Sequence, residues 1–498
     1  MHSTLEAPSL PNLRWASLNG LPAFWIESSE PFAAGLVFRV GRADETLSTA
    51  GVTHLVERLA FASLAPRTIL DNATCEAAFT SFHATGNEED VVAFVEQAAR
   101  GVYLLETAAM DREIEAMRAP RRNDERDRLS RLLYLRFGAT GYGLVGGAEY
   151  GLPSLTPSRV AAWARARFTR ENAALWFVGV PPRDLPLDLA TGTWVAPPTA
   201  ATIPGLSTPS TVAGSSGSVA FSMIIARTPA APVVLAAVLQ RATQSLRDVR
   251  GLASRVRADY LPLDADTAHV MIVATCADGD SPAVATLIVD LLAELASSGP
   301  SPVEIQRSID QMIESRGRPA THLSSVSRAA RDFLLGIDPH TQEQHVEERR
   351  EVRSETGAVA LQGAFASAIA MVPEGTEWRD HRFEPISWRS PAVVSGRSVN
   401  QRGHSPLPRF LRGGGAAAGT AAKLIIGAEG VSLVIGADTA HTVRFADCVG
   451  LVRGSAGERT VIGRDGTAVS IDPAHWPDGP AIIDAVERSV PVALHVAG

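Results

Sequence analysis

The sequence almost lacks lysine: Lys423 is the only one among 46 basic residues, so nearly every cation is an arginine. Such a bias is typical of a bacterial chain from a GC-rich genome. Acidic residues number 54, which gives a formal charge of −8. A chain with this balance has no global positive field, which argues against general binding of nucleic acid or of anionic lipid.

Cysteine and long apolar runs are also scarce. The three cysteines (Cys75, Cys276 and Cys448) lie far apart and form no CxxC pair, which excludes a disulfide framework and a cysteine-based zinc cluster. Met1–Pro11 lacks the pattern of a secretory signal. No stretch reaches the roughly 18 apolar residues of a membrane span. We therefore expect a multidomain protein of the cytoplasm, with no membrane partner.

Two segments rich in proline, glycine and serine divide the chain. We predict linkers at 181–217 and 384–415, and domains at 1–180, 218–383 and 416–498. The first domain begins with strand-like text, continues with helices and ends on the strand Ala173–Val180. One of the predicted helices is Thr156–Thr169, with Thr156 as its cap before Pro157 at the first helical position. The second repeats that order loosely. The sequence thus predicts an α+β fold with two homologous domains.

The last block is different. Six short strand-like segments separated by turn sequences precede one helical segment, Gly479–Ser489, which indicates a small β-barrel closed by a helix. The block resembles pleckstrin-homology-like domains, which implies binding of a lipid headgroup or a peptide. From Gly415 onward, six cations face nine anions. This balance argues against an anionic lipid and favours a docked protein or peptide.

The most informative stretch is Gly51–Phe61, with the sequence GVTHLVERLAF. On a helix His54, Glu57 and Arg58 share one face, because residues three and four apart are neighbours. A metal-dependent hydrolase would place His, Glu and His there: the imidazoles would bind zinc and the carboxylate would take a proton from metal-bound water.

Several segments besides this motif resemble the insulinase-type, or inverted-zincin, metallopeptidases, whose mark is HxxEH. The resemblance covers the first block from end to end, the second only by pattern, and the third not at all. It implies two homologous α+β domains that form half of a clamshell. The matching segments are SLNGLPAFWIE (Ser17–Glu27), VGRADET (Val40–Thr46), AFTSFHATG (Ala78–Gly86) and GLPSLTPSRVAAWARARFTRENAALWFVG (Gly151–Gly179).

The departures from that family's pattern affect the metal ligands. Arg58 takes the place of the second histidine, and a guanidinium has no lone pair to give to zinc. The third ligand, a glutamate in a downstream helix, falls on Pro120 or on Arg122, depending on the alignment; a small shift would admit Glu125. His54, Glu57 and Arg58 therefore read as relics of a catalytic site, and we expect no metal or other cofactor in this chain.

The resemblance implies a second role for such a chain. Half-sized subunits of this family pair, and an inactive one closes the chamber while its homologue carries the zinc. The inactive partner supplies an Arg and a Tyr that bind the substrate peptide. In Gly251–Asp266 the candidates are Arg255, Arg257 and Tyr260, although an ordinary surface arginine and a tyrosine beside a turn fit the same text.

We therefore predict a non-catalytic subunit of a heterodimeric zinc metallopeptidase that acts on peptides, with leader-peptide trimming as one such task. The alternative is a peptide-binding or scaffold protein with no associated protease. A third option is an active enzyme with an unconventional metal site. The arginines between Arg118 and Arg131 are interleaved with acids and fit either a solvated helix face or a docking surface. Serine-hydrolase and phosphate-loop motifs are absent from the sequence.

Overall fold

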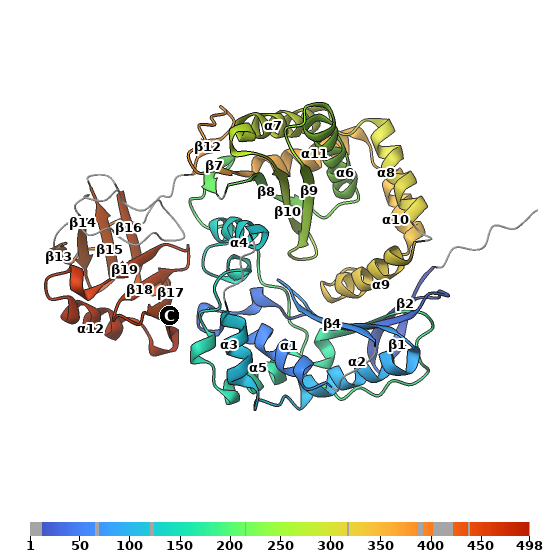
Figure 1. The fold of residues 1–498 in the computed structure, drawn as a ribbon, viewed down its shortest axis with the longest axis horizontal. Helices are drawn as coiled ribbons and strands as arrows, with labels where there is room; N and C mark the ends of the chain where they lie inside the picture. Colours follow the sequence, from blue (N-terminus) through green and yellow to red (C-terminus); the bar gives the residue numbers. More distant parts are fainter. Residues whose placement is uncertain are drawn as a thin grey trace, which may run out of the picture.

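The computed structural model describes residues 12–64, 69–119, 124–214, 216–315, 318–386, 392–401, 422–436 and 439–497. These residues form two α+β units built on six-stranded sheets, and a C-terminal unit with two four-stranded sheets. Figure 1 shows the first two units one above the other, with the C-terminal unit at one side of both.

The first sheet has the strand order β1-β2-β6-β3-β5-β4, and only β2 and β6 pair in parallel. Its strands are β1 (Leu13–Leu18), β2 (Leu21–Ile26), β3 (Phe32–Phe38), β4 (Leu70–Cys75), β5 (Thr80–Gly86) and β6 (Ala173–Val178). Strand β6 is buried along its whole length, because both faces of the sheet are covered.

Helices from both α+β units cover that sheet. Helices α1 (Val52–Ala62), α2 (Glu88–Tyr103) and α5 (Pro157–Arg167) share one core with the sheet. Helix α3 (Met110–Arg118) lies beside α1. The opposite face packs against α9 (Pro319–Leu334), which belongs to the second half of the sequence. The side chain of Thr156, predicted as a helix cap, accepts a hydrogen bond from the Arg159 amide, which confirms that prediction.

The second sheet has the order β12-β7-β11-β8-β10-β9. Its strands are β7 (Ser210–Gly214), β8 (Ser218–Ala226), β9 (Arg255–Pro262), β10 (Thr267–Thr275), β11 (Ile369–Pro373) and β12 (Glu384–Pro385). Strand β7 lies within the segment 181–217, so that segment is not only a linker. It pairs with β11, which follows it by more than 150 residues, and this distant pairing leaves no local signal.

Helices α6 (Ala230–Ala242), α7 (Ser281–Ser298) and α11 (Ser354–Ala366) cover one face of the second sheet, and α6 continues as a wider turn over Thr243–Val249. Leu132 of α4 (Asp124–Phe137) packs on the other face. Each sheet thus receives a helix from the other half of the chain, α9 in one case and α4 in the other. This exchange joins the two α+β units into one body.

Helix α7 meets the length and composition expected of a membrane span, with a mean hydropathy of 1.3 over an 18-residue window within 278–298. It is the only helix of this kind in the described part of the chain. Its apolar residues, among them Val284, Ile288 and Leu292, are fully buried against the second sheet and α11. The helix therefore contributes a core face of the second unit.

The C-terminal unit contains the sheets β13-β14-β15-β16 and β19-β18-β17-β20, with α12 (Gly479–Ser489) packed on their shared core. Within the described residues the strands form these two sheets and no closed barrel, which corrects that part of the prediction. Strand β13 lies in the segment predicted as the second linker. The strands are β13 (Arg397–Asn400), β14 (Ala422–Ile426), β15 (Gly430–Ile435), β16 (Thr439–Arg444), β17 (Cys448–Arg453), β18 (Arg459–Gly463), β19 (Ala468–Ile471) and β20 (His495–Ala497).

This unit docks on the first α+β unit. The Tyr134 hydroxyl donates to the Gly466 carbonyl at 2.9 Å, and the Ala139 amide donates to the Arg464 carbonyl at 3.0 Å. Leu47, which lies just before α1, packs with Ile462 in a small apolar core that also contains Tyr134 and Ala139.

The remaining helices, α8 (Pro302–Ser315) and α10 (Gln342–Arg350), pack on each other at the edge of the second unit.

Candidate functional site

Helix α1 carries the candidate site, and its first turn is held in place by Gly51 and Glu45. Gly51 has a left-handed backbone with φ of 100°. The Glu45 carboxylate accepts hydrogen bonds from the amides of Gly51 at 2.8 Å and Thr53 at 2.7 Å. A carboxylate here satisfies free amides and complements the positive end of the helix dipole. Burial raises the pKa of Glu45 to about 7, although both amides and Arg42 act against it.

His54 is held from one side of its ring. Its Nδ1 lies 2.9 Å from Glu149 Oε1 and 3.0 Å from Arg42 Nη2, and these two partners are themselves 3.1 Å apart. Its Nε2 lies 3.9 Å from Glu57 Oε2. Burial lowers the pKa of His54, and Arg42 and Arg58 add to that effect against the opposing Glu149. A neutral imidazole oriented by a carboxylate is the form that binds metal in proteins.

Arg58 makes an ion pair with Glu113 of α3. Its Nε and Nη2 donate to Glu113 Oε2 at 2.9 and 2.6 Å. Arg112 Nη2 donates to Oε1 of the same carboxylate at 3.1 Å. Burial alone would raise the pKa of Glu113, but the hydrogen bonds from the two arginines outweigh it and lower the pKa. Both oxygens of Glu113 are therefore engaged by guanidinium groups.

Glu57 has no comparable hydrogen bond among those found for the described residues. It is 7% exposed, and burial raises its pKa to about 7, while Arg58 and Arg42 act in the opposite direction. This carboxyl thus exchanges its proton near neutral pH. In an active hydrolase a group with such a pKa would suit a general base.

The residues present do not fit a zinc ion. Among the described residues, no set of three His, Cys, Asp or Glu donor atoms close enough to share a metal includes His54. The position of the second ligand holds the guanidinium of Arg58, and this group is paired with the carboxylate of Glu113. The predicted third-ligand positions Pro120 and Arg122, and the side chain of Glu125, lie outside the described residues.

A pocket of about 350 Å³ opens beside this cluster. Arg42, His54 and Glu149 line it, together with Arg118 of α3 and the segment 146–153. Ala497 of the C-terminal unit also lines it, and the Ala497 amide donates to Ser154 Oγ at 3.4 Å. The C-terminal unit therefore forms part of the pocket wall next to helix α1.

The predicted substrate-binding residues lie on β9, the edge strand of the second sheet. Arg255 and Arg257 are two residues apart and so share one face of the strand, whereas Tyr260 lies on the other face. Arg257 Nη2 is 3.3 Å from Asp259 Oδ2. Tyr260 is 43% exposed. Strand β9 ends at Pro262.

Sequence reasoning missed two residues of this cluster, Arg42 and Glu149. Glu149 is 95 residues from His54 and comes from a loop without a motif. Glu113 carried a usable signal, since an arginine placed on the buried face of α1 needs a carboxylate, and Glu113 is the buried acid of α3.

Comparison with known proteins finds no matching family model and no matching curated protein. Solved structures do match. A protease from Helicobacter pylori superimposes with a TM-score of 0.58 at 16% identity, over 73% of this chain and 100% of that one. A peptidase M16 inactive domain from Pseudomonas fluorescens gives 0.56 at 14% identity, over 75% and 100%.

This chain has the fold of M16-type peptidases. Pitrilysin also matches, with a TM-score of 0.56 at 14% identity, over 75% of this chain but only 46% of the pitrilysin chain. The match thus spans about half of that longer protein, which agrees with the half-clamshell that the sequence predicted. Identities this low show the fold alone, so the chemistry depends on the residues described above.

Proposed function

We propose that this chain is the non-catalytic subunit of a heterodimeric zinc metallopeptidase. It closes the chamber and binds the substrate peptide, and a zinc-bearing homologue performs the cleavage. The observation that carries the proposal is the ion pair between Arg58 and Glu113, because it occupies the face of α1 where a metallopeptidase needs a second imidazole.

The arrangement around α1 supports a structural use of the former catalytic groups. Two arginines and two glutamates surround His54 and Glu57, and the pairs Arg42–Glu149 and Arg58–Glu113 neutralise each other. A polar cluster of this kind fixes the positions of α1, of α3 and of the loop before α5, which carries Glu149. The first unit thereby keeps the shape of a peptidase half without a metal.

The edge strand β9 supports the peptide-binding part of the proposal. Its outer side has no neighbouring strand among the described residues, so its backbone amides and carbonyls face outward there. An extended peptide can pair with such an edge while a nearby guanidinium binds one of its carbonyls. Of the two predicted arginines, Arg257 is held by Asp259, and Arg255 is the more exposed.

The test compares the chain alone with a mixture of the chain and an intact HxxEH homologue from its genomic neighbourhood. We expect no peptidase activity from the chain alone and chelator-sensitive activity from the mixture, on substrates such as the leader region of a precursor peptide. Chelator-sensitive cleavage by the chain alone would overturn the proposal. A homologue that is fully active without this chain would do the same.

A second measurement separates substrate binding from assembly. Arg255→Ala and Arg257→Ala should each lower kcat/KM of the mixture about tenfold and leave the heterodimer intact in gel filtration, since one charge-assisted hydrogen bond is worth roughly 1.5–3 kcal/mol. Arg247→Ala, in the exposed turn after α6, serves as the control. Unchanged rates in both β9 variants would remove these residues from the peptide site.

The competing function is a peptide-binding or scaffold protein without any protease. The pocket beside α1 favours it specifically, because the C-terminal unit helps to line this pocket within a single chain. Tight peptide binding by the chain alone, with no homologue that associates with it, would favour this second function. A cytoplasmic location, a C-terminal unit of pleckstrin-homology type that docks a protein, and the absence of a membrane partner remain part of the proposal.

A further inference from the structure

A second histidine and glutamate cluster lies far from α1, at the corner between α9 and α10. It contains His340 from the turn before α10, and His345 and Glu348 from α10 itself. His340 Nδ1 is 2.7 Å from Glu348 Oε1, and His345 Nδ1 is 3.2 Å from Glu348 Oε2. The centroids of the two imidazole rings are 5.5 Å apart. One carboxylate therefore faces both rings.

The local fold fixes this corner. Helix α9 ends in a turn with Gly336 at φ of 83°, where the Ile337 amide donates to the Asp332 carbonyl. Thr341 caps the start of helix α10. Its hydroxyl accepts a hydrogen bond from the Gln344 amide, and the Gln344 side chain accepts one from the Thr341 amide. This reciprocal cap holds the residue before it, His340, over the first turn of α10.

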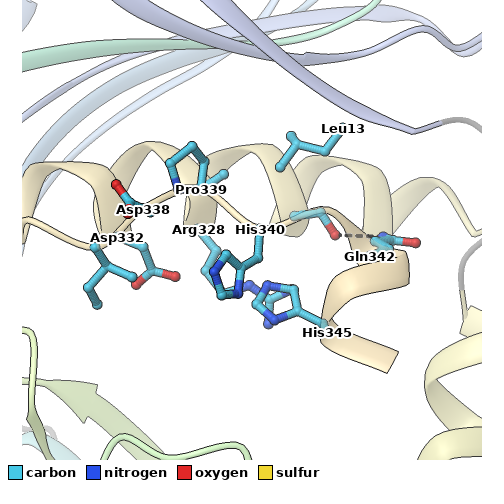
Figure 2. Close-up of a pocket in the computed structure, with 11 residues that line it drawn as sticks. Leu13, Arg328, Asp332, Asp338, Pro339, His340, Gln342 and His345 are labelled. Carbon is cyan, nitrogen blue, oxygen red and sulfur yellow. Dashed lines mark hydrogen bonds between the residues drawn. The ribbon is translucent and has the colours of Figure 1, made fainter. Parts of the chain in front are cut away.

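The corner also opens to a small cavity. His340 and His345 line a pocket of about 40 Å³ together with Arg328 and Leu13 of β1. Figure 2 shows the two imidazole rings next to each other, with Arg328 beside them. The Gln342 side chain donates to Ser325 of α9 at 3.0 Å. The volume is enough for one or two water molecules next to the rings.

The donor atoms have the spacing of a metal site. In tetrahedral zinc sites the ligands lie 2.0–2.2 Å from the ion, so neighbouring ligand atoms are about 3.3 Å apart. The three donor atoms here, one from each residue, lie within 4.8 Å of one another. The two imidazoles face different oxygens of the Glu348 carboxylate, His340 at 2.7 Å from Oε1 and His345 at 3.2 Å from Oε2. Small side-chain rotations therefore suffice to place an ion between them. No other set of this kind occurs among the described residues.

We propose that His340, His345 and Glu348 bind a zinc ion, with water in the remaining coordination position. Two imidazoles and one carboxylate are a donor set that zinc accepts readily. The ion would tie the turn after α9 to the first turns of α10. Because α9 also covers the first sheet, this would stiffen the contact between the two α+β units.

The charges around the cluster set how tightly the ion is held. Arg328 lies near His345 and Arg349 lies near Glu348, and both oppose a dication, while Asp338 lines the same pocket and favours it.

The experiment uses the full chain without an affinity tag, freed of metal by a chelator and titrated with Zn²⁺ alone in a calorimeter. We expect saturable binding of about one ion. His340→Ala and His345→Ala should each weaken it at least tenfold. Glu348→Gln, which keeps the side-chain shape, should weaken it as well. His475→Ala should change nothing, although its Nδ1 also lies near an aspartate, 3.6 Å from Asp472.

Other results would overturn the proposal. One is that the wild-type chain shows no saturable binding of Zn²⁺. Another is that both histidine variants still bind Zn²⁺ as tightly as the wild type does. Loss of the ion in His54→Ala would assign it to α1 instead. Thermal melts in metal-free buffer check that each variant folds, and only the wild type should gain stability when Zn²⁺ is added. The outcome is independent of the proposed peptidase role, because a chain that pairs with no homologue would still bind zinc here.

Discussion

The pattern HxxER occurs twice in the chain, as HLVER at 54–58 on α1 and as HVEER at 345–349 on α10. In both places His and Glu are one helical turn apart. On α1, Glu57 is 7% exposed and Arg58 is paired with Glu113. The groups beside the His54 ring are a carboxylate and a guanidinium, those of Glu149 and Arg42. On α10 the preceding turn supplies His340. The helical motif is the same, and the neighbouring segment decides whether a second imidazole lies beside it.

The comparison predicts that α1 lacks only one donor. In a His345→Ala background, Arg58→His should raise zinc retained after gel filtration from none to about one ion per chain. The reason is that the substitution removes a fixed positive charge, adds an imidazole on the face of His54 and frees Oε2 of Glu113 from Arg58, while Oε1 keeps its contact with Arg112. Metal analysis of the purified variant makes the measurement.

A matched control is Arg112→His, which places an imidazole beside the same Glu113 but on α3, where Arg112 is exposed. This variant should retain no zinc. If Arg58→His folds normally and also retains none, then Arg58 is not the reason that α1 lacks a metal, and the comparison fails at its first step.

The ion pair between Arg58 and Glu113 should also stabilise the first unit. Glu113→Gln is expected to lower the free energy of unfolding by about 2 kcal/mol at pH 7, because Arg58 loses the carboxylate that compensates its partly buried charge. Urea denaturation of both chains measures the difference. Glu115→Gln on the same helix is the control, since Glu115 is exposed and should give a change within about 0.5 kcal/mol.

The direction of the pKa shift gives this prediction a pH dependence. Hydrogen bonds from the arginines lower the pKa of Glu113 in the folded chain. Its stabilising effect is therefore complete above the ordinary value of about 4.3 and is lost as the pH falls through the folded value. A difference between wild type and Glu113→Gln that stays constant down to pH 3 would contradict this assignment.

Glu57 should have the opposite pH dependence. Burial raises its pKa to about 7, so the folded chain binds its proton more tightly than the unfolded chain does. The stability of the wild type should therefore fall as the pH rises from about 4.3 to about 7. Glu57→Gln removes that loss and should be more stable than wild type by about 2 kcal/mol at pH 8, with little difference at pH 4.

The matching position on α10 sharpens the test. Glu348 is half-buried, and the metal-free Glu348→Gln variant should differ from wild type by no more than about 0.5 kcal/mol at either pH. Equal gains from both substitutions would show that burial does not distinguish the two motifs.

The features that sequence predicts well here are local ones. The strand Ala173–Val180 is a continuous apolar run, and α5 has its cap and proline in the first turn; the structure confirms both, with β6 two residues shorter. Helices α9 and α10 were missed. Helix α9 buries its apolar face on the sheet of the other unit, so no adjacent segment reveals its partner.

The residues of the candidate site also fall into two groups, those that local sequence spacing predicts and those that only the tertiary packing brings together. His54, Glu57 and Arg58 are readable because helical spacing alone brings them together. Arg42 and Glu149 come from segments 12 and 95 residues away, and only the packing of the first unit places them on the imidazole. The cluster on α10 leaves no familiar ligand spacing in the sequence, because His340 comes from the turn that precedes the helix cap.

The smallest expected effect concerns charge near the α10 cluster. Arg328 is exposed, yet it lies close enough to lower the pKa of His345. Arg328→Gln should therefore tighten Zn²⁺ binding about threefold at low salt, and the gain should vanish near 0.5 M salt because screening removes exposed charge interactions beyond a few ångströms. Calorimetric titration at both salt concentrations measures it. Arg488→Gln removes an exposed arginine from α12 and should leave the affinity unchanged. If both substitutions tighten binding equally, the net charge of the chain, and not Arg328 itself, controls the affinity of this corner for the ion.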